Sequence, residues 1–407
     1  MNPNYTYIML DAIGIQRYIF ETNTLRIITG SSLWLAQWQK ECKGLCRSHG
    51  GEIITSAGGN VLAKFTQEEK ALKFKESAIK ARPAGLEIAW AKVESDNDNA
   101  EDIWSKLQVE IAKFKAGERE KNDYIQPQKF IDRIGCQFCG VRPSDGKGEI
   151  EKKDICEVCC KKYEKGKSLT ESTSAKTLIE SLNKKAGSFP QELDKMVEIP
   201  ESKETELLAV VVIDLNEMGT WIENIVKDKG FKELHTFSEG LESGIAGICN
   251  GLIDDMMGKG DNWKNLNVKN EHGLRIRPLF LGGDDLVFAM PVSLWQKFVS
   301  FIFDGLKDIV SDGLKDKKLE ACAGIMIAKH NFPINQLVEM AEDLCANAKG
   351  LVKYKKQSNK DIGGFALDWH IHQESVFESP VAIRKRSFLK EIGNYKYAIA
   401  TDKPYFY

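Results

Sequence analysis

The sequence predicts an α+β fold in which one unit, strand–helix–hairpin–strand–helix, occurs twice. Both copies begin with an apolar strand that ends in an aspartate, at residues 5–11 and 207–214. Both then contain a Gly-Gly turn between two strands, at Gly58-Gly59 and at Gly282-Gly283. This order is typical of two ferredoxin-like domains, or palm domains, each an antiparallel sheet with helices on one face.

The first copy supplies each element of this unit in turn. A helical segment with apolar residues at Leu33, Leu35, Ala36 and Trp38 follows the first strand. Residues 53–65 form a strand, the Gly-Gly turn and a second strand. A further strand at residues 86–93 leads into a helix at residues 100–115, which completes the unit.

The second copy repeats the same order. Its first strand precedes a helix near residues 234–253, the Gly-Gly hairpin, a strand at residues 321–328 and a helix at residues 334–353. The last helix has apolar residues at three-and-four spacing, which should pack on the sheet: Leu337, Met340, Leu344, Ala348 and Leu351. Residues 365–374 and 395–407 are expected to be short strands or loops that close this domain.

Length and composition set limits on the class of protein. The 407 residues allow two or three domains, and 42% hydrophobic with 29% charged residues is an ordinary globular mixture. The net charge of −2 provides no global positive field for gripping a long nucleic acid. The sequence contains neither a transmembrane segment nor a signal peptide, so we expect a cytoplasmic protein that does not bind membranes.

Five of the ten cysteines lie between Cys136 and Cys160. Two Cys-x-x-Cys pairs, Cys136 with Cys139 and Cys156 with Cys159, are separated by sixteen residues, which matches a four-cysteine zinc ribbon. Cys160 could replace Cys159, but it breaks the spacing. A Zn²⁺ ion bound by four thiolates has no open coordination position, so its predicted role is structural.

The second Gly-Gly hairpin carries the residues that indicate catalysis. Asp284 and Asp285 follow its glycines, and Asp214 ends the first strand of the same copy. Three clustered carboxylates, with the backbone carbonyl of Leu215 as a fourth donor, could hold two Mg²⁺ or Mn²⁺ ions. The alternatives are that the Gly-Gly-Asp-Asp segment is an ordinary turn and that Asp214 caps a helix.

Neighbouring residues fit the binding of a nucleotide at this hairpin. Gly282 and Gly283 would let the backbone approach phosphate groups without a side-chain clash. Lys349 or Lys353, near the end of the last helix, could reach the β- and γ-phosphates, although a solvated lysine is also favourable at a helix C-terminus. The first copy has Asn60 after its glycines, so only the second copy is predicted to be catalytic.

These observations divide the chain into four predicted segments. Residues 1–125 form a degenerate first palm domain without a catalytic carboxylate pair, and residues 126–170 form the zinc ribbon. Residues 171–205 are a helical connector. Residues 206–407 form the second palm domain, which contains the Gly-Gly-Asp-Asp motif.

With these motifs, the sequence resembles the large, polymerase-like subunit of type III CRISPR effector complexes. Residues 15–20 and 56–60 resemble that family's first, nucleotide-cyclase-like palm domain and its degenerate hairpin, and residues 212–215, 282–285 and 324–330 resemble the active palm domain. The resemblance implies cyclic oligoadenylate synthesis from ATP, with metal binding by Asp214, Asp284 and Asp285. It implies, more weakly, adenine contacts by the residues Ser31 or Ser32, and Ser238.

The resemblance also carries expectations about partners and about a missing activity. Other subunits of a type III effector, with guide RNA and target RNA, are the implied partners. No His-Asp dipeptide occurs in the sequence, so we expect the form that lacks the HD nuclease domain and does not cleave DNA.

The leading hypothesis is therefore a pyrophosphate-releasing nucleotidyltransferase that uses ATP or another NTP in antiviral signalling. One alternative is a non-enzymatic, nucleotide-binding subunit of an RNA-guided complex. The other is a diguanylate-type cyclase that uses GTP. Diguanylate cyclases normally pair two chains, and a homodimer is one possible arrangement here.

Overall fold

The computed structural model divides the chain into two compact units. Unit 1 comprises residues 1–180, 217–243 and 310–316, and unit 2 comprises residues 181–216, 244–309 and 317–407. The structure describes residues 5–97, 99–117, 135–144, 149–150, 153–171, 177–202, 204–259, 263–309, 318–357, 364–372, 379–392, 395–398 and 403–407. The boundary predicted at residues 125 and 126 lies outside these described residues.

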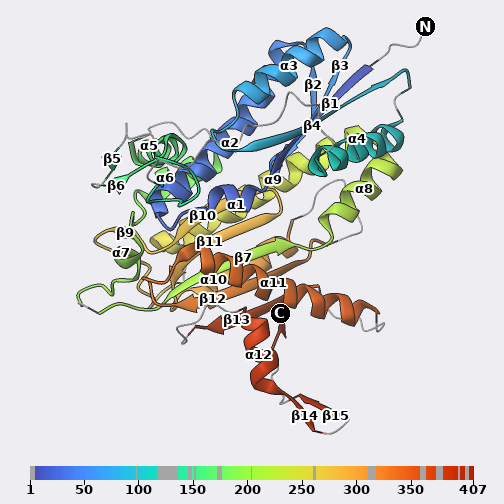
Figure 1. The fold of residues 1–407 in the computed structure, drawn as a ribbon. Helices are drawn as coiled ribbons and strands as arrows, with labels where there is room; N and C mark the ends of the chain where they lie inside the picture. The colour runs from blue at the N-terminus through green and yellow to red at the C-terminus, as the bar shows by residue number, and fades with distance from the viewer. Residues whose placement is uncertain are drawn as a thin grey trace. The chain divides into compact units, whose positions relative to one another are not determined.

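Unit 1 contains a four-stranded antiparallel sheet with the order β2-β3-β1-β4 (Figure 1). Its strands are β1 (Tyr5–Ile13), β2 (Glu52–Ala57), β3 (Asn60–Phe65) and β4 (Glu87–Ser95). Strands β2 and β3 form the predicted hairpin, because Gly58 and Gly59 both take positive φ angles, 58° and 84°, which glycine adopts without steric cost.

Unit 1 also contains α1 (Ile15–Ile19), α2 (Leu25–Ser48), α3 (Glu68–Lys80), α4 (Ala100–Lys115), α8 (Met218–Lys229) and the first half of α9 (Phe231–Asp254). Of these, α2, α3 and α4 pack on the sheet. Helix α2 packs on β2 and β3, and α4 packs on β4. The side chain of Asn99 starts α4 by accepting a hydrogen bond of 3.1 Å from the backbone of Asp102.

The cysteine-rich insert packs on α2 of unit 1. It contains β5 (Glu149–Ile150), β6 (Lys153–Asp154) and α5 (Glu157–Glu171). Glycines allow the backbones of α2 and α5 to cross closely, since a Cβ atom at Gly30 would lie 1.9 Å from the carbonyl oxygen of Lys162. The fully buried Lys162 ammonium pairs with Glu21 at 2.5 Å, and Arg142 contacts the same carboxylate at 2.8 Å. Lys162 and Arg142 therefore fasten two parts of the insert to the segment before α2.

Unit 2 contains a six-stranded sheet with the order β10-β11-β7-β12-β13-β16. Its strands are β7 (Leu208–Leu215), β10 (Arg277–Gly282), β11 (Asp285–Pro291), β12 (Ala321–Ala328), β13 (Ala366–Ile371) and β16 (Tyr405–Phe406). The first four repeat the order of the unit 1 sheet. Strand β13 extends the sheet parallel to β12, and β16 pairs antiparallel with β13, so residues 366–371 and 405–406 close the domain as strands.

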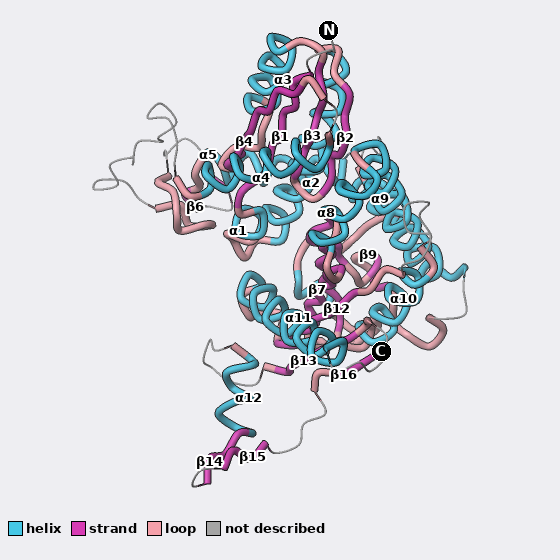
Figure 2. The backbone as a smooth tube through the Cα atoms, turned by 90° about the vertical axis from the view of Figure 1, so that its right-hand side faces the viewer, coloured by secondary structure: helices cyan, strands magenta, loops and turns pink. Residues whose placement is uncertain are grey.

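Helices cover both faces of the unit 2 sheet, so the prediction of helices on one face is wrong here. Asp368 of β13 contacts Asn347 of α11 (Ile334–Gln357), while the next residue, Trp369, contacts Trp295 of α10 (Trp295–Lys307). Consecutive residues of a strand point to opposite faces, so α10 and α11 lie on opposite sides, as Figure 2 also shows. The continuous apolar run of β7 requires this cover, because its residues are buried on both faces.

The packing of α11 agrees with its predicted apolar pattern at four of five positions. Leu337, Met340, Leu344 and Ala348 are buried. Leu351 is only half-buried, and the adjacent Val352 is buried in the last turn.

The remaining described elements are α6 (Leu178–Ala186), α7 (Leu193–Val197), the π-helical turn Asp255–Lys259, β8 (Lys269–Asn270), β9 (Gly273–Leu274), α12 (Pro380–Phe388), β14 (Leu389–Ile392) and β15 (Tyr395–Ala398). The first two lie in the segment predicted to be a helical connector. None of the helices that the structure describes has the length and apolar character needed to cross a lipid bilayer.

Candidate active site

The three aspartates predicted to be catalytic lie at one end of the unit 2 sheet. Asp214, near the end of β7, is paired in register with Asp285 at the start of β11. Asp284 occupies the turn before β11, and its carbonyl oxygen accepts a hydrogen bond of 3.2 Å from the backbone N–H of Leu215. The sheet pairing therefore brings together residues that are 70 positions apart in the sequence.

The glycines shape the turn that carries Asp284 and Asp285. Gly283 has a left-handed φ of 60°, whereas Asp284 does not take a positive φ. A glycine at the first central position only is typical of a type II′ hairpin turn. At Gly282 a Cβ atom would lie 2.2 Å from the ring of Phe280, so a side chain there would displace this aromatic ring.

The two hairpin carboxylates share an environment that disfavours negative charge. Burial, followed by the negative charge of Asp214, raises the pKa of Asp284 above its usual range. The same two causes raise the pKa of Asp285 to about 7. A cation would stabilise the negative charges of these half-buried carboxylates, which is the property expected of metal ligands.

Lys349 provides positive charge at this cluster. Its ammonium group forms an ion pair with the Oδ2 atom of Asp214. Burial opposes the charge of Lys349, but the bond to Asp214 raises its pKa, so the amine stays protonated. Lys353, the other lysine considered from the sequence, is exposed.

The sequence interpretation did not include Glu342, which also faces the cluster from α11. Burial is the main cause that raises the pKa of Glu342 to about 7, and the charge of Asp214 contributes. Its Oε1 atom is buried without a hydrogen-bond partner. A signal was available, since Glu342 precedes Lys349 by seven residues, two helical turns, and therefore lies on the same face of the helix.

The serines predicted to contact adenine lie in unit 1. Ser31 and Ser32 are buried in α2, and the Ser31 hydroxyl donates a hydrogen bond of 2.8 Å to the carbonyl of Ile27. Ser238, on α9, forms a hydrogen bond of 3.0 Å with Thr55 and lines a pocket of about 440 Å³. The adenine contacts of all three serines stay predictions.

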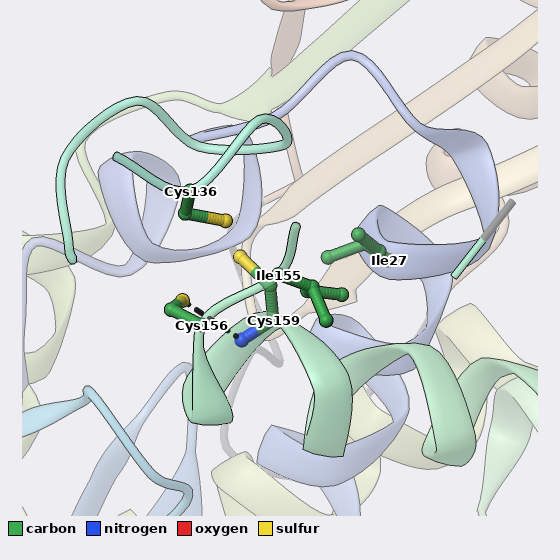
Figure 3. Packing of buried hydrophobic residues seen from close by; sticks show 5 residues of the cluster. All are labelled: Ile27, Cys136, Ile155, Cys156 and Cys159. Atoms are coloured by element: carbon green, nitrogen blue, oxygen red, sulfur yellow. Dashed lines mark hydrogen bonds between the residues drawn. The ribbon is translucent and has the colours of Figure 1, made fainter. Parts of the chain in front are cut away.

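The four predicted cysteine ligands come together in the insert of unit 1, and Figure 3 shows three of them, Cys136, Cys156 and Cys159. The sulfur atoms of Cys136, Cys139, Cys156 and Cys159 all lie within 4.8 Å of one another, so they could hold one metal ion. Hydrogen bonds from Cys156 and Cys159 lower the pKa of the Cys139 thiol, and the same contacts raise the pKa of Cys156 and Cys159, so one thiolate is favoured among these three thiols when no metal is bound. Cys160 is not part of this group.

The two metal sites predicted from the sequence differ in how closely their ligands approach. Within the described ranges, two groups place three or more ligand atoms within 4.8 Å: the four cysteines, and Glu198 with Glu271 and His272. The three aspartates do not form such a group. Lys349 already contacts one oxygen of Asp214, so a cation would compete with its ammonium group.

Part of this sequence matches a known protein family, and the fold matches solved structures. Residues 207–361 match the family model described as Cas10/Cmr2, second palm domain. The chain matches none of the curated proteins with which it was compared.

Solved structures of Csm1 share the fold over most of this chain. A Csm1–Csm4 cassette in complex with cA4 matches with a TM-score of 0.55 and 14% identity over 91% of this chain and 55% of that one. A cassette in complex with AMPPNP matches with a TM-score of 0.52, 15% identity and coverages of 86% and 53%. Csm1 of T. onnurineus matches with a TM-score of 0.51, 16% identity and coverages of 86% and 52%.

The chain thus spans about half the length of these Csm1 chains. At such identities the structural matches establish the fold alone, whereas the family model covers the strand end and hairpin that carry the three aspartates. Residues 207–361 are therefore a second palm domain of the Cas10/Cmr2 family.

Proposed function

We propose that this chain is a metal-dependent nucleotidyltransferase that joins ATP molecules into a cyclic oligoadenylate for type III CRISPR defence. The observation that carries the proposal is the register of Asp214 with Asp285, beside Asp284, in a half-buried turn that matches the Cas10/Cmr2 second palm domain. The match to Csm1 structures supports it, because chains of this fold are described in complex with cA4, cA3 and AMPPNP.

The proposed reaction forms one phosphodiester bond in each step. A ribose hydroxyl of one nucleotide attacks the α-phosphorus of another, the bond to the β-phosphate breaks, and pyrophosphate leaves. The hydroxyl proton passes to water or to a carboxylate of the site. Closure of the ring repeats this step within one linear product.

We propose that the site binds two divalent cations, Mg²⁺ or Mn²⁺. Asp214, Asp284 and Asp285 would hold them, since carboxylate oxygens are the ligands these ions prefer. Such ions would supply a lowered pKa for the attacking hydroxyl and neutralisation of the leaving pyrophosphate.

Other groups of the chain bind and orient the nucleotide in this proposal. Lys349 keeps its positive charge at the cluster. When cations bind Asp214 in its place, its ammonium group would pair with phosphate oxygens. Gly283 keeps the turn free of a side chain where the phosphates approach. Glu342 adds a fourth carboxylate that can accept a hydrogen bond from a metal-bound water or a ribose hydroxyl.

The cysteine cluster is proposed to hold one structural Zn²⁺ ion. Four thiolates would complete a tetrahedral site, and Lys162 and Arg142 connect the insert to unit 1. We further propose that the chain works with other type III effector subunits, guide RNA and target RNA. This rests on the Csm1–Csm4 complexes that it resembles.

A product assay tests the proposed function. The full chain is incubated with each NTP and Mn²⁺, alone and with effector subunits and target RNA, and the products are resolved by mass spectrometry. We expect ATP to give pyrophosphate and cyclic oligoadenylates. A product from GTP alone would identify a diguanylate-type cyclase, and bound nucleotide without any pyrophosphate would identify a non-enzymatic subunit.

A further inference from the structure

A second group of metal-ligating side chains lies in unit 2, outside the carboxylate cluster. The hairpin of β8 and β9 has Glu271 and His272 at its turn, and Glu198 is the first residue after α7. One ligand atom from each of these three residues lies within 4.8 Å of the other two. None of the three belongs to the proposed active site or to the cysteine cluster.

The distances in this group match the edges of a metal coordination shell. The Nε2 atom of His272 lies 3.1 Å from Oε2 of Glu198 and 3.2 Å from Oε1 of Glu271. Ligands held about 2.1 Å from one cation are separated by roughly 3.0–3.4 Å in octahedral or tetrahedral geometry. A single imidazole nitrogen carries at most one hydrogen, so it cannot make a full hydrogen bond to both carboxylates.

Hydrogen bonds hold the backbone at two of the three ligands, Glu198 and His272. The Asn270 side chain donates to the carbonyl of Lys195 at 2.7 Å and more weakly to that of Glu198 at 3.3 Å. The same side chain accepts a bond of 3.0 Å from the backbone N–H of His272. The hairpin turn is therefore bound to the end of α7, and Glu198 and His272 need little reorganisation to bind a cation.

The strand after the turn is fastened as well. Gly273 lies so close to Ser188 that a Cβ atom would approach its carbonyl oxygen to 2.5 Å. The fully buried Arg275 donates to the carbonyl of Met196 at 3.0 Å and pairs with Glu206 at 2.6 Å. These contacts make the position of His272 relative to Glu198 a fixed feature of unit 2.

We propose that Glu198, Glu271 and His272 bind a divalent transition-metal cation of the Zn²⁺ class. A nitrogen ligand with two carboxylates favours zinc or its neighbours over Ca²⁺ and Mg²⁺, which select oxygen ligands. Lys195 forms an ion pair of 2.7 Å with the Oε1 atom of Glu198, so the Oε2 atom of this carboxylate can bind the metal. The exposed side of the group admits water to the remaining coordination positions, so the ion fastens the hairpin to the end of α7.

Metal content measured on the full chain tests this site. The wild type and the variants His272→Gln and His330→Gln are dialysed to equilibrium against micromolar free Zn²⁺, and bound zinc is counted by mass spectrometry. We expect His272→Gln to bind one zinc fewer than the wild type. His330→Gln, which changes a histidine outside the group, should bind as much as the wild type.

Hydrogen exchange supplies a readout that does not depend on counting ions. Zinc should slow the exchange of amides at residues 268–274 at least threefold in the wild type and leave it unchanged in His272→Gln. The variant Glu271→Gln, at an 81% exposed side chain that cannot affect folding strongly, should lose part of this protection. Equal zinc content and equal exchange in the wild type and His272→Gln would overturn the proposal.

Discussion

The two Gly-Gly hairpins of this chain share one backbone design and differ in their chemistry. In unit 1, Asp11 of β1 is paired in register with Asn60 of β3. In unit 2, Asp214 of β7 is paired with Asp285 of β11 at the equivalent place. The strand orders β2-β3-β1-β4 and β10-β11-β7-β12 are the same, so Asn60 stands where the second hairpin has a carboxylate.

The equivalence extends to single hydrogen bonds. The backbone N–H of Ala12 donates to the carbonyl of Gly59 at 3.1 Å, and that of Leu215 donates to the carbonyl of Asp284 at 3.2 Å. Gly59 is thus the counterpart of Asp284. The first hairpin lacks both carboxylates of the second, although an equivalent backbone hydrogen bond joins its turn to the neighbouring strand.

The strand-end aspartates also have equivalent partners. Lys115, the last residue of α4, pairs with Asp11 at 2.7 Å, and Lys349 of α11 pairs with Asp214. A lysine from the helix after the fourth strand therefore belongs to the shared design rather than to catalysis alone. The hairpins differ in the aspartate pair and in the φ angle of the second turn residue, Gly59 or Asp284, and variants in matched positions can show which difference decides activity.

Removal of one hairpin carboxylate should have the largest effect. We expect Asp285→Asn to lower the rate of oligoadenylate formation at least about 10³-fold, since the cluster loses a ligand that stabilises the transition-state charge. Asp11→Asn makes the same chemical change in unit 1 and should keep the rate within about threefold. Rates of pyrophosphate release measure both, and equal losses in the two variants would contradict the assignment of catalysis to unit 2.

Replacing the two equivalent lysines should change the rate less than replacing the hairpin carboxylate does. Lys349→Met is expected to lower the rate about 10–100-fold, because it removes a positive charge that can bind phosphate at the site. Lys115→Met should change the rate by less than about threefold. A kinetic analysis separates the roles: loss of phosphate binding raises KM for ATP, and a purely structural role of Lys349 would lower thermal stability with KM unchanged.

The sequence was sufficient for the hairpins because their signals are local. Glycine at positive φ, a strand on each side and an aspartate at the end of an earlier strand specify the turn and its sheet neighbour. The continuous apolar run before Asp214 is typical of a strand that is buried on both faces of the sheet. The prediction of helices on one face did not take this into account.

Side-chain contacts made by α11 were less predictable. Lys349 and Lys353 are four residues apart, so they lie on the same side of the helix, one turn from each other. Which of them reaches Asp214 depends on the position of α11 along the sheet, and this is set by how residues such as Leu344 pack against β12. Glu342 was missed for a different reason, since an acidic residue on a helix usually faces solvent.

The raised pKa of Asp285 predicts that the wild type and Asp285→Asn differ in how their stability depends on pH. Its folded-state pKa of about 7 lies above the unfolded value of about 3.9, so folding is favoured by protonation, and stability falls as pH rises from 4 to 7. The variant Asp285→Asn has no carboxyl group at this position, so its stability should not fall with pH for this reason. Without added Mg²⁺ or Mn²⁺ we expect the stability advantage of the variant over the wild type to be roughly 2–3 kcal/mol larger at pH 8 than at pH 5.

Denaturant unfolding at the two pH values measures this difference. Asn60→Asp provides the reverse change in unit 1, where it adds a carboxylate beside Asp11, and should make the protein less stable at pH 8 than at pH 5. A constant difference between Asp285→Asn and the wild type at both pH values would show that Asp285 is not held in a charge-disfavouring site.

Restoring the missing pair to the first hairpin should produce the smallest effect. The double variant Gly59→Asp with Asn60→Asp places both carboxylates in unit 1, but the turn does not accept them as the second turn does. Gly59 has a φ of 84°, and a Cβ atom there would lie 2.2 Å from the Cδ1 atom of Ile15. Asp284 has no such backbone strain, so its side chain and that of the new residue would point differently.

We therefore expect this double variant to be about 1–2 kcal/mol less stable than the wild type and to recover no activity in an Asp285→Asn background. Adding Ile15→Ala relieves the contact with the side chain and should restore part of the stability but not the activity, because the positive φ remains. Product formation above the Asp285→Asn background would mean that the carboxylates alone distinguish the two hairpins. Stability lost without activity gained would place the difference in the turn geometry, which gives Asp284 a backbone conformation that Gly59 does not share.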